Sequence, residues 1–479
     1  MTVLTLLHNL KYKTTIDDCT VTGVTSDTRA VKEGSLFVCI KGIRRDGHDY
    51  AKEALDKGAC AVVCERDLGL NRQILVDDTR KAFSLLCIRW YGDPASKMKL
   101  IGVTGTNGKT TVTCLLKQML ERFGCKVGLI GTMHNMIGDR TLETANTTPL
   151  PDKLQEVLAE MQREGCEYVV MEVSSQALEE ERVYGMHFTR ALFTNLTQDH
   201  LDFHKTMERY FAAKCKLFDM ADQAVVNLDD AYGKQIAGAA PCPVLTYSVD
   251  TDAAAFTAKN VRPRADGVAF EVLGEGIIGR ANIKIPGLFS VYNALCAVAC
   301  AASLGFDFDR VLAALGAAEG VKGRLEVVPT GRDYTVLIDY AHTPDGLENV
   351  LSALRSFTQG RLIALFGCGG DRDKTKRPKM GAVVARYADL AVVTSDNPRS
   401  ENPAAIIDDI LAGMQDSKTP REVIENRRDA IFWTIAHAKP GDVIVLAGKG
   451  HETYQILKDG EIHFDEREVV AQALASLRK

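Results

Sequence analysis

Short apolar runs alternate with segments of helical pattern over the last third of the chain. Four of these runs are TVLID, RLIALF, DLAVVT and DVIVLA. This alternation predicts a mostly parallel sheet with helices on both faces. Another buried run, LIGVTG, opens the middle of the chain and is followed by a glycine turn and a helical pattern. The predicted fold class is therefore α/β.

The chain is longer than one ordinary core, because it has 479 residues, so we expect several domains. Residues 1–98 mix short strands with helix-like stretches, and residues 99–328 begin at LIGVTG. Turn residues in PTGRDY, 329–334, indicate a linker. The predicted domains are 1–98, 99–328 and 329–479.

Composition excludes some classes of protein. The net charge is −5 and no long basic run is present, which argues against a nucleic-acid partner. No apolar stretch is long enough for a membrane span, and MTVLTLLHNLKYK is too short in its apolar part for a signal peptide. The 13 cysteines contain no CxxC pair. Pairs such as Cys60 and Cys64 suggest a metal or redox site or, as we favour, buried small side chains in a reducing cytoplasm.

Polar clusters follow each of the four apolar runs, namely DYAHTPDG, GCGGDRDK, SDNPRSENP and GKGHET. Ligands of parallel α/β sheets bind outside the carboxyl ends of the strands. One polar loop would carry little weight, since loops are polar anyway. Four of them at one rim predict a binding site.

The string VTGTNGKTT, 103–111, lies between a predicted strand and a predicted helix. Backbone N–H groups at such a turn can hold phosphate, while Lys109 reaches the β/γ-phosphates and Thr110 holds Mg²⁺. Val103 stands where a complete Walker A motif begins with glycine, so a glycine turn with a surface lysine is the alternative. We favour phosphate binding by Gly105, Thr106, Asn107, Gly108, Lys109, Thr110 and Thr111.

A magnesium site needs further oxygen ligands. Glu172 ends the apolar run YVVME, and His200 lies in NLTQDHLDFH after another apolar run. We expect both near Mg²⁺. Two histidines and two aspartates in the second string also allow zinc, which we favour less because no cysteine ligand accompanies them.

The strings TGTNGKTT, MEVSSQAL, TNLTQDHLDFH, YFAAKCKLF, GRLE, DYAHTPDG, DNPR and GKGHE occur in this order along most of the chain. This series resembles the Mur ligases, the ATP-dependent amino-acid-adding family of peptidoglycan synthesis. VTSDTR, GSLFVCIKG and DGHDY resemble the nucleotide-sugar domain of members that extend UDP-N-acetylmuramoyl-L-Ala-D-Glu. The resemblance implies a small α/β nucleotide-sugar domain, a central P-loop-type ATPase domain and a C-terminal Rossmann-like domain.

The resemblance also implies a mechanism and residues for it. ATP phosphorylates the γ-carboxylate of D-Glu, an amine attacks the acyl phosphate, and phosphate leaves. Lys109, His200 and Lys214 are the expected catalytic residues. Lys214 takes the position of a carbamylated lysine that supports Mg²⁺, whereas the residues alone suggest a surface lysine on the helix ERYFAAKCKLF. The expected metal residues are Thr110, Glu172, His200 and Lys214, and the further ATP residues are Asn293, Arg324 and Asp339.

By the same resemblance, the UDP-muramoyl-dipeptide is expected to bind Thr28, Thr147, Thr148, Ser174, Glu180 and Arg182. Hydroxyl groups and an arginine suit a ligand rich in oxygen atoms. The sequence departs from some relatives, which puts fine substrate contacts in doubt but not the class. These departures are Gln176, Glu180 and Ser290, with Ile43, Arg44 and Arg45 in the uridine loop.

Arg399 lies in DNPR, within the polar cluster SDNPRSENP that follows DLAVVT. A guanidinium suits a planar anion, and Asp396 with Glu452 suits an ammonium. The residues alone equally allow a solvated ion pair of Arg399 with Asp396 or Glu401. DNPR marks diaminopimelate addition in the family, so we expect meso-diaminopimelate to bind Arg372, Asp396, Asn397, Pro398, Arg399, Gly448 and Glu452.

Two other functions remain as alternatives. A folylpolyglutamate-type ligase would not need VTSDTR or the DNPR pocket. A non-catalytic P-loop switch would explain TGTNGKTT but not Lys214, His200 and the four polar clusters. The expected enzyme is a monomeric cytoplasmic ligase with neither a nucleic-acid nor a membrane partner.

Overall fold

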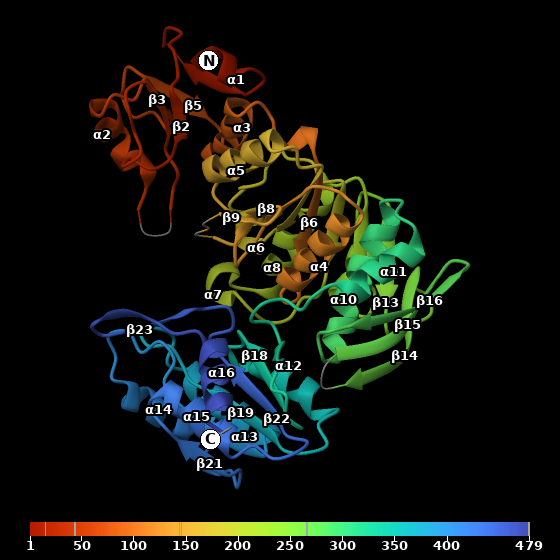
Figure 1. Ribbon diagram of the computed structural model, residues 1–479. Coiled ribbons are helices and arrows are strands. Elements are labelled where there is room, and N and C mark those ends of the chain that lie inside the picture. The colour runs from red at the N-terminus through yellow and green to blue at the C-terminus, as the bar shows by residue number, and fades with distance from the viewer. Residues whose placement is uncertain (15, 43–44, 143, 145, 265–266, 478–479) are drawn as a thin grey trace. The chain divides into compact units, whose positions relative to one another are not determined.

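The structure is a computed structural model that describes residues 1–14, 16–42, 45–142, 144, 146–264 and 267–477 (Figure 1). The chain divides into two compact units. The first unit comprises Met1–Ala255 with Ala299–Gly305, and the second comprises Phe256–Val298 with Phe306–Lys479.

The first unit begins with a five-stranded sheet of order β1-β5-β4-β3-β2. Only β1 is antiparallel to its neighbour. The Asp78 carboxylate accepts the N–H groups of Arg80 and Lys81, and this cap starts the helix that packs on the sheet. The elements are α1 (Val3–Leu7), β1 (Tyr12–Thr14), β2 (Gly23–Thr25), β3 (Ser35–Val38), α2 (Ala51–Asp56), β4 (Ala61–Cys64), β5 (Gln73–Val76) and α3 (Thr79–Trp90).

The first unit continues with a larger sheet in which β6 lies between β10 and β11. These three strands are parallel, and every residue of β10 is buried, as is typical of a strand covered on both faces. The strands are β6 (Lys99–Thr104), β7 (Val127–Ile130), β8 (Asn135–Ile137), β9 (Arg140–Leu142), β10 (Tyr168–Glu172), β11 (Arg190–Phe193), β12 (Ala224–Asn227) and β13 (Val244–Ser248). The helices are α4 (Lys109–Arg122), α5 (Pro151–Arg163), α6 (Ser175–Glu179), α7 (Leu201–His204), α8 (Met207–Cys215) and α9 (Ala231–Ala239).

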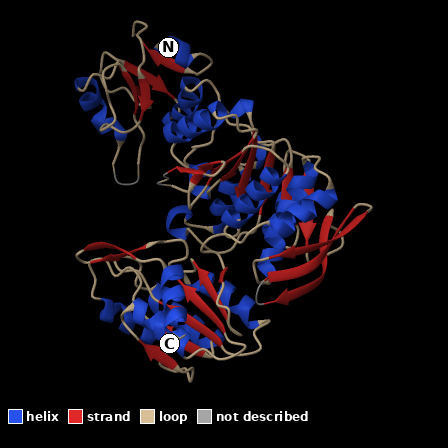
Figure 2. Ribbon diagram, viewed as in Figure 1, coloured by secondary structure: helices blue, strands red, loops and turns tan. Residues whose placement is uncertain are grey.

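The second unit contains a sheet of order β17-β18-β22-β19-β20-β21, parallel except for β17. Figure 2 shows these strands with helices packed around them. The predicted runs form β18 (Thr335–Asp339), β19 (Leu362–Phe366), β20 (Leu390–Val393) and β22 (Val443–Ala447). The other elements of this part are β17 (Glu326–Val328), α12 (Pro344–Arg355), α13 (Lys376–Tyr387), α14 (Pro403–Ala412), β21 (Arg421–Val423), α15 (Arg427–Ala436), β23 (Tyr454–Leu457), β24 (Gly460–His463) and α16 (Glu466–Ser476).

An antiparallel group of strands, not predicted from the sequence, also belongs to the second unit. It consists of β14 (Phe256–Arg264), β15 (Gly267–Gly274) and β16 (Ile277–Ile283), and α11 (Phe308–Ala317) follows α10 (Leu288–Ser303). The α/β fold class is confirmed. The boundaries 1–98, 99–328 and 329–479 stay a prediction, and 329–334 joins β17 to β18 within one sheet instead of linking two sheets. No helix within the described ranges is long and apolar enough to cross a membrane.

Candidate active site

The phosphate loop connects β6 to α4 in the first unit. Gly105 and Gly108 have φ values of 145° and 87°, a backbone region that favours glycine. A Cβ added to Gly105 would clash with the hydroxyl oxygen of Thr194. Gly108 precedes α4 and has no side chain to cap it, so the first N–H groups of a 14-residue helix face the loop. The local geometry suits an anion.

Two lysines converge on this loop. Lys109 Nζ donates to the carbonyl oxygens of Gly105 and Thr106, each at 2.9 Å, and Lys214 Nζ donates to the same Gly105 carbonyl at 2.8 Å. Lys214 is 1% exposed, so the surface-lysine interpretation of this residue is wrong. Burial holds the pKa of Lys214 well below its ordinary value, and the nearby charge of Lys109 acts in the same direction.

Glu172 lies beside the loop as a buried carboxylate. It accepts hydrogen bonds from Thr110 Oγ1 at 3.0 Å, from Thr132 N–H at 2.9 Å and from Thr132 Oγ1 at 3.0 Å. Within the described ranges no lysine or arginine forms an ion pair with it. A buried carboxylate without a cation, next to a hydroxyl group at a phosphate loop, is a suitable donor set for a hard divalent cation.

His200 lies near the same loop but is more exposed. Its Nε2 atom is 3.4 Å from the carboxylate of Asp199, and its ring centroid is 6.1 Å from that of Tyr210. The Tyr210 hydroxyl is 3.1 Å from Thr106 Oγ1, and the Lys214 ammonium lies 4.5 Å from the Tyr210 ring centre. The described part of the chain contains no group of three His, Cys, Asp or Glu side chains placed to hold a metal, so the zinc alternative gains no support.

A hydrogen-bonded network joins most of the residues expected to meet the muramoyl-dipeptide. Thr148 Oγ1 donates to the Glu172 carbonyl at 2.9 Å and accepts the Ser174 N–H at 3.1 Å. Arg182 Nη1 donates to the Thr148 carbonyl at 2.7 Å, and Arg182 Nε and Nη2 both donate to Glu180 Oε2, at 3.0 and 2.6 Å. The network connects these side chains to the end of β10, next to the phosphate loop. Thr147 reaches the same place through Thr132, with 3.0 Å between the two hydroxyl oxygens.

A pocket of the first unit is lined by Glu180 and Arg182 together with residues that were not predicted from the sequence. Ser26, Ile40, Arg80, Phe83, Leu150, Pro151, Glu180 and Arg182 line it. Thr28 is not among these lining residues, although Ser26 belongs to the same VTSDTR string. Ser26 could therefore have been predicted from the VTSDTR string. Arg80 and Phe83 lie on α3, where no motif marks them. The departures at Ile43 and Arg44 lie outside the described residues.

In the second unit, acids from two strand-end loops share a buried lysine. Lys449 Nζ donates to Asn397 Oδ1 and to Glu452 Oε2, each at 3.0 Å, and lies 3.6 Å from Asp396 Oδ1. Lys449 is 0% exposed. This residue was not predicted from the sequence, although it stands in GKGHE. Two carboxylates against one ammonium leave this cluster with one net negative charge.

Arg399 lies next to this cluster in a left-handed conformation, with φ of 55°. Its Nη1 donates to the carbonyl oxygens of Gly370 at 2.9 Å and Asn397 at 3.4 Å. Neither the Asp396 nor the Glu401 ion pair considered for it is formed among the described residues, because Glu401 pairs with Arg377 and Lys374.

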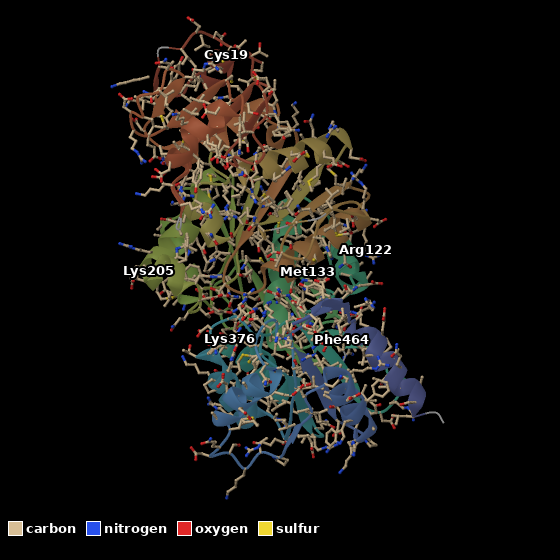
Figure 3. All side chains as sticks on the ribbon, turned by 90° about the vertical axis from the view of Figure 1, so that its left-hand side faces the viewer. Cys19, Arg122, Met133, Lys205, Lys376 and Phe464 are labelled. Atoms are coloured by element: carbon tan, nitrogen blue, oxygen red, sulfur yellow. The ribbon has the colours of Figure 1, made fainter. Side chains whose placement is uncertain are left out.

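Arg372, Gly448 and Pro398 were also expected to bind diaminopimelate. Arg372 Nη1 donates to the neighbouring Asp371 carbonyl at 3.0 Å, and Arg372 is exposed. Gly448 has φ of 116°, and a Cβ there would lie 3.1 Å from Asp396 Oδ2. Pro398 accepts the Glu401 N–H at 3.1 Å. Nearby, Lys376, which Figure 3 labels, lies on the first turn of α13. Its Nζ donates to the His342 carbonyl at 3.0 Å.

Asn293, Arg324 and Asp339 also lie in the second unit. Asp339 is buried and accepts the N–H groups of Leu325 and Ala341, each at 2.7 Å. Burial raises the pKa of Asp339, against the opposing influence of Arg324. The Arg324 guanidinium carbon lies 5.1 Å from the Tyr340 ring centre, and Asn293 is buried on α10.

Three family models match successive parts of the chain. The catalytic domain of the Mur ligase family matches residues 20–87, the Mur ligase middle domain matches 103–301, and the Mur ligase glutamate ligase domain matches 323–450. The chain belongs to the Mur ligase family. This confirms the three-domain α/β architecture and the ligase class, so the alternative of a non-catalytic P-loop switch is wrong.

Individual relatives of this Mur ligase are similar over nearly their whole length. One, from Caldanaerobacter subterraneus, is 49% identical over 477 residues, with 98% of each chain covered. Another, from Clostridium acetobutylicum, is 47% identical over 480 residues, covering 98% of this chain and 99% of the relative. Both are named as UDP-N-acetylmuramoyl-L-alanyl-D-glutamate--2,6-diaminopimelate ligases. A solved structure of an enzyme with that name has a TM-score of 0.74 and 31% identity over 96% of each chain.

Proposed function

We propose that this Mur ligase joins meso-diaminopimelate to the D-Glu residue of UDP-N-acetylmuramoyl-L-Ala-D-Glu at the expense of ATP. The observation that carries the proposal is Arg399, whose guanidinium bonds to backbone carbonyl oxygens and has no ion pair in the described part of the chain. The names of the relatives at 49% and 47% identity support it. They also disfavour a folylpolyglutamate-type ligase.

The charges around Arg399 suit a zwitterion. The guanidinium fits a carboxylate, and the net negative cluster of Asp396, Glu452 and Lys449 fits an ammonium. Asp396 Oδ1 is buried and has no hydrogen-bond partner among the described residues, although the Lys449 ammonium lies 3.6 Å away. meso-Diaminopimelate carries both groups on its distal carbon. Lysine lacks the distal carboxylate, so it would leave Arg399 desolvated and unpaired.

The first unit supplies the residues for phosphoryl transfer. Lys109 and the N–H groups at the start of α4 hold the phosphates of ATP in line with the γ-carboxylate of D-Glu. That carboxylate takes the γ-phosphoryl group and ADP leaves. The amine of diaminopimelate then attacks the acyl carbon, loses a proton, and expels phosphate as the amide forms. Lys109 exchanges its bonds to the Gly105 and Thr106 carbonyls for phosphate oxygens.

Thr110 and Glu172 fit a resident Mg²⁺, because they offer oxygen ligands beside the phosphate loop and Glu172 has no cationic partner there among the described residues. When bound, Mg²⁺ supplies neutralisation of the phosphate charge. Thr132 orients Glu172 by donating both its N–H and its hydroxyl group. His200 completes the expected set of metal residues.

Lys214 is proposed to carry a carbamate. Its low pKa favours the neutral amine, which is the form that adds carbon dioxide, and the product is a carboxylate that can support Mg²⁺. Intact mass measured at neutral pH tests this assignment. We expect an acid-labile carboxyl adduct that is absent from Lys214→Ala. An unmodified wild-type protein after mild preparation would remove the carbamate from the mechanism.

The pocket lined by Ser26, Arg80 and Phe83 is the proposed place of the nucleotide-sugar. A cationic and an aromatic side chain suit a nucleotide, and Arg182 and Glu180 line the same pocket. Arg182 connects this pocket to Thr148 by a hydrogen bond, and Thr148 is hydrogen-bonded to Ser174. Thr147 lies close by, bonded to Thr132. Thr28 stays a prediction, two residues along the chain from Ser26.

Some assignments rest on the family resemblance alone. These are the ATP contacts of Asn293, Arg324 and Asp339, the monomeric state and the cytoplasmic location. We keep them as proposals, and light scattering against the chain mass of 52.3 kDa tests the monomer.

Phosphate release by the purified protein with ATP, Mg²⁺ and UDP-N-acetylmuramoyl-L-Ala-D-Glu tests the function. meso-Diaminopimelate and L-lysine are supplied in parallel, and the products are identified by mass. We expect turnover with diaminopimelate and at most a trace with lysine. Comparable turnover with lysine would contradict the role of Arg399, and no turnover with either would contradict the proposed reaction.

A further inference from the structure

Arg377, on the first turn of α13, is a buried arginine outside the residues assigned above. Its side chain is 1% exposed and holds Glu401 in a two-pronged pair, with Nη2–Oε1 at 2.8 Å and Nη1–Oε2 at 3.1 Å. Nη1 also donates to Asp409 on α14 at 2.8 Å. Both carboxylate oxygens of Glu401 therefore accept hydrogen bonds from Arg377, in the geometry that binds a guanidinium most specifically.

Glu401 lies close enough to Arg399 to compete for it. Both residues flank Gly370, since Arg399 Nη1 is 2.9 Å from the Gly370 carbonyl. A Cβ built on Gly370 would lie 3.3 Å from Glu401 Cβ. The two side chains are also only two positions apart in the chain. Arg377 holds the pKa of Glu401 down to about 2, so the carboxylate is charged at any working pH.

We propose that Arg377 is a positioning residue for the incoming amino acid, because it sequesters the Glu401 carboxylate and leaves the Arg399 guanidinium for the substrate carboxylate. This inference rests on the proposed function of Arg399. Without Arg377, Glu401 rotates toward Arg399 and occupies the place of the diaminopimelate carboxylate. Arg377 thereby protects both affinity for diaminopimelate and discrimination against lysine.

The other partners of Glu401 do not replace Arg377. Lys374 Nζ is 3.2 Å from Glu401 Oε2, but the Lys374 side chain is 68% exposed and its ammonium is well solvated. The Asp371 N–H donates to Glu401 Oε1 at 2.6 Å and carries no charge. Arg377 is the buried cation of this set, so its removal changes the electrostatics around Glu401 most.

The test is a double-mutant cycle with Arg377→Met and Glu401→Gln. We expect Arg377→Met to raise the KM for diaminopimelate by about tenfold, the effect of one competing charged pair. The KM values for ATP and the nucleotide-sugar stay unchanged. The preference for diaminopimelate over lysine falls in parallel. Adding Glu401→Gln to Arg377→Met removes the competitor, so both values return toward wild type.

Controls separate this role from mere packing. Arg386→Met, on the exposed face of the same helix, should leave all constants unchanged, because Arg386 pairs with Glu348 at the surface. Arg377→Lys keeps the positive charge, so its KM for diaminopimelate should lie between those of wild type and Arg377→Met. If Arg377→Met folds poorly, the comparison of Arg377→Lys with wild type still tests the inference. A double variant as impaired as Arg377→Met, or an unaffected Arg377→Met, overturns the inference. Inactive wild-type protein overturns the proposed function instead.

Discussion

Arg399 is the residue on which the choice of amino acid depends. Arg399→Ala removes the proposed partner of the substrate carboxylate, at a cost of about 2–5 kcal/mol when such a pair is desolvated. We therefore expect the KM for diaminopimelate to rise on the order of 100-fold, while the KM for ATP stays within about twofold. Steady-state kinetics in each substrate measure both values. Equal losses for the two substrates would contradict a role confined to the amino acid.

Single residues also show where prediction from the sequence ends. DNPR and GKGHE were enough to suggest that Asp396, Arg399 and Glu452 lie together, because both strings follow parallel strands. The burial of Lys449 and Lys214 could not be predicted in this way, since a lysine in a loop or amphipathic helix is normally solvated. Their burial depends on tertiary neighbours, such as Asn397 for Lys449, and not on local pattern.

At the scale of elements, a buried ion pair fastens α15 and α16 to the rim of the sheet. Arg427 and Glu466 are 0% exposed, with 2.7 Å between Nη2 and Oε1. Arg427 Nη2 also donates to the Ala447 carbonyl at 2.9 Å, just before the GKGHE loop. Removing one charge from a buried pair leaves the other uncompensated. We expect Glu466→Gln to lower the free energy of unfolding by about 3 kcal/mol.

Denaturant unfolding measures this change, and α16 offers a matched control. Glu468, on the same helix, forms an exposed pair with His463 at the end of β24, so Glu468→Gln should change the free energy of unfolding by less than about 0.5 kcal/mol. Similar effects of the two substitutions would show that helix sequence, and not the buried pair, determines the loss.

Elements were predictable where their apolar pattern was strong. TVLID coincides with β18, and LIGVTG with most of β6. Both strands could be predicted because parallel strands are buried on both faces and therefore appear as continuous apolar runs. β14 was not predicted, since its second half is largely exposed and polar. β8, β9 and β21 have three residues each, too few for a periodic signal. The grouping of residues 256–298 with the end of the chain depends on contacts distant in sequence.

The whole molecule has 13 cysteines, all within the described residues, and the structure forms no disulfide among them. Stability of the native fold therefore owes nothing to disulfides, and a reductant should leave the Tm unchanged. Burial raises the pKa of Cys39 and Cys368 to about 12 and that of Cys64 to about 11. A raised pKa keeps a thiol protonated at pH values below it, and the protonated form is a poor nucleophile.

Thiol titration with an aromatic disulfide reagent at pH 8 follows from these pKa shifts. We expect the native protein to react at only a few cysteines, because the buried thiols are both protonated and inaccessible. The same sample in denaturant, without reductant, should react at all 13. A lower count in denaturant would reveal a disulfide that the structure does not contain. Rapid reaction of all thiols in the native protein would instead show that the chain around Cys39, just after β3, and Cys64, in β4, opens readily, contrary to the position of both residues in the core.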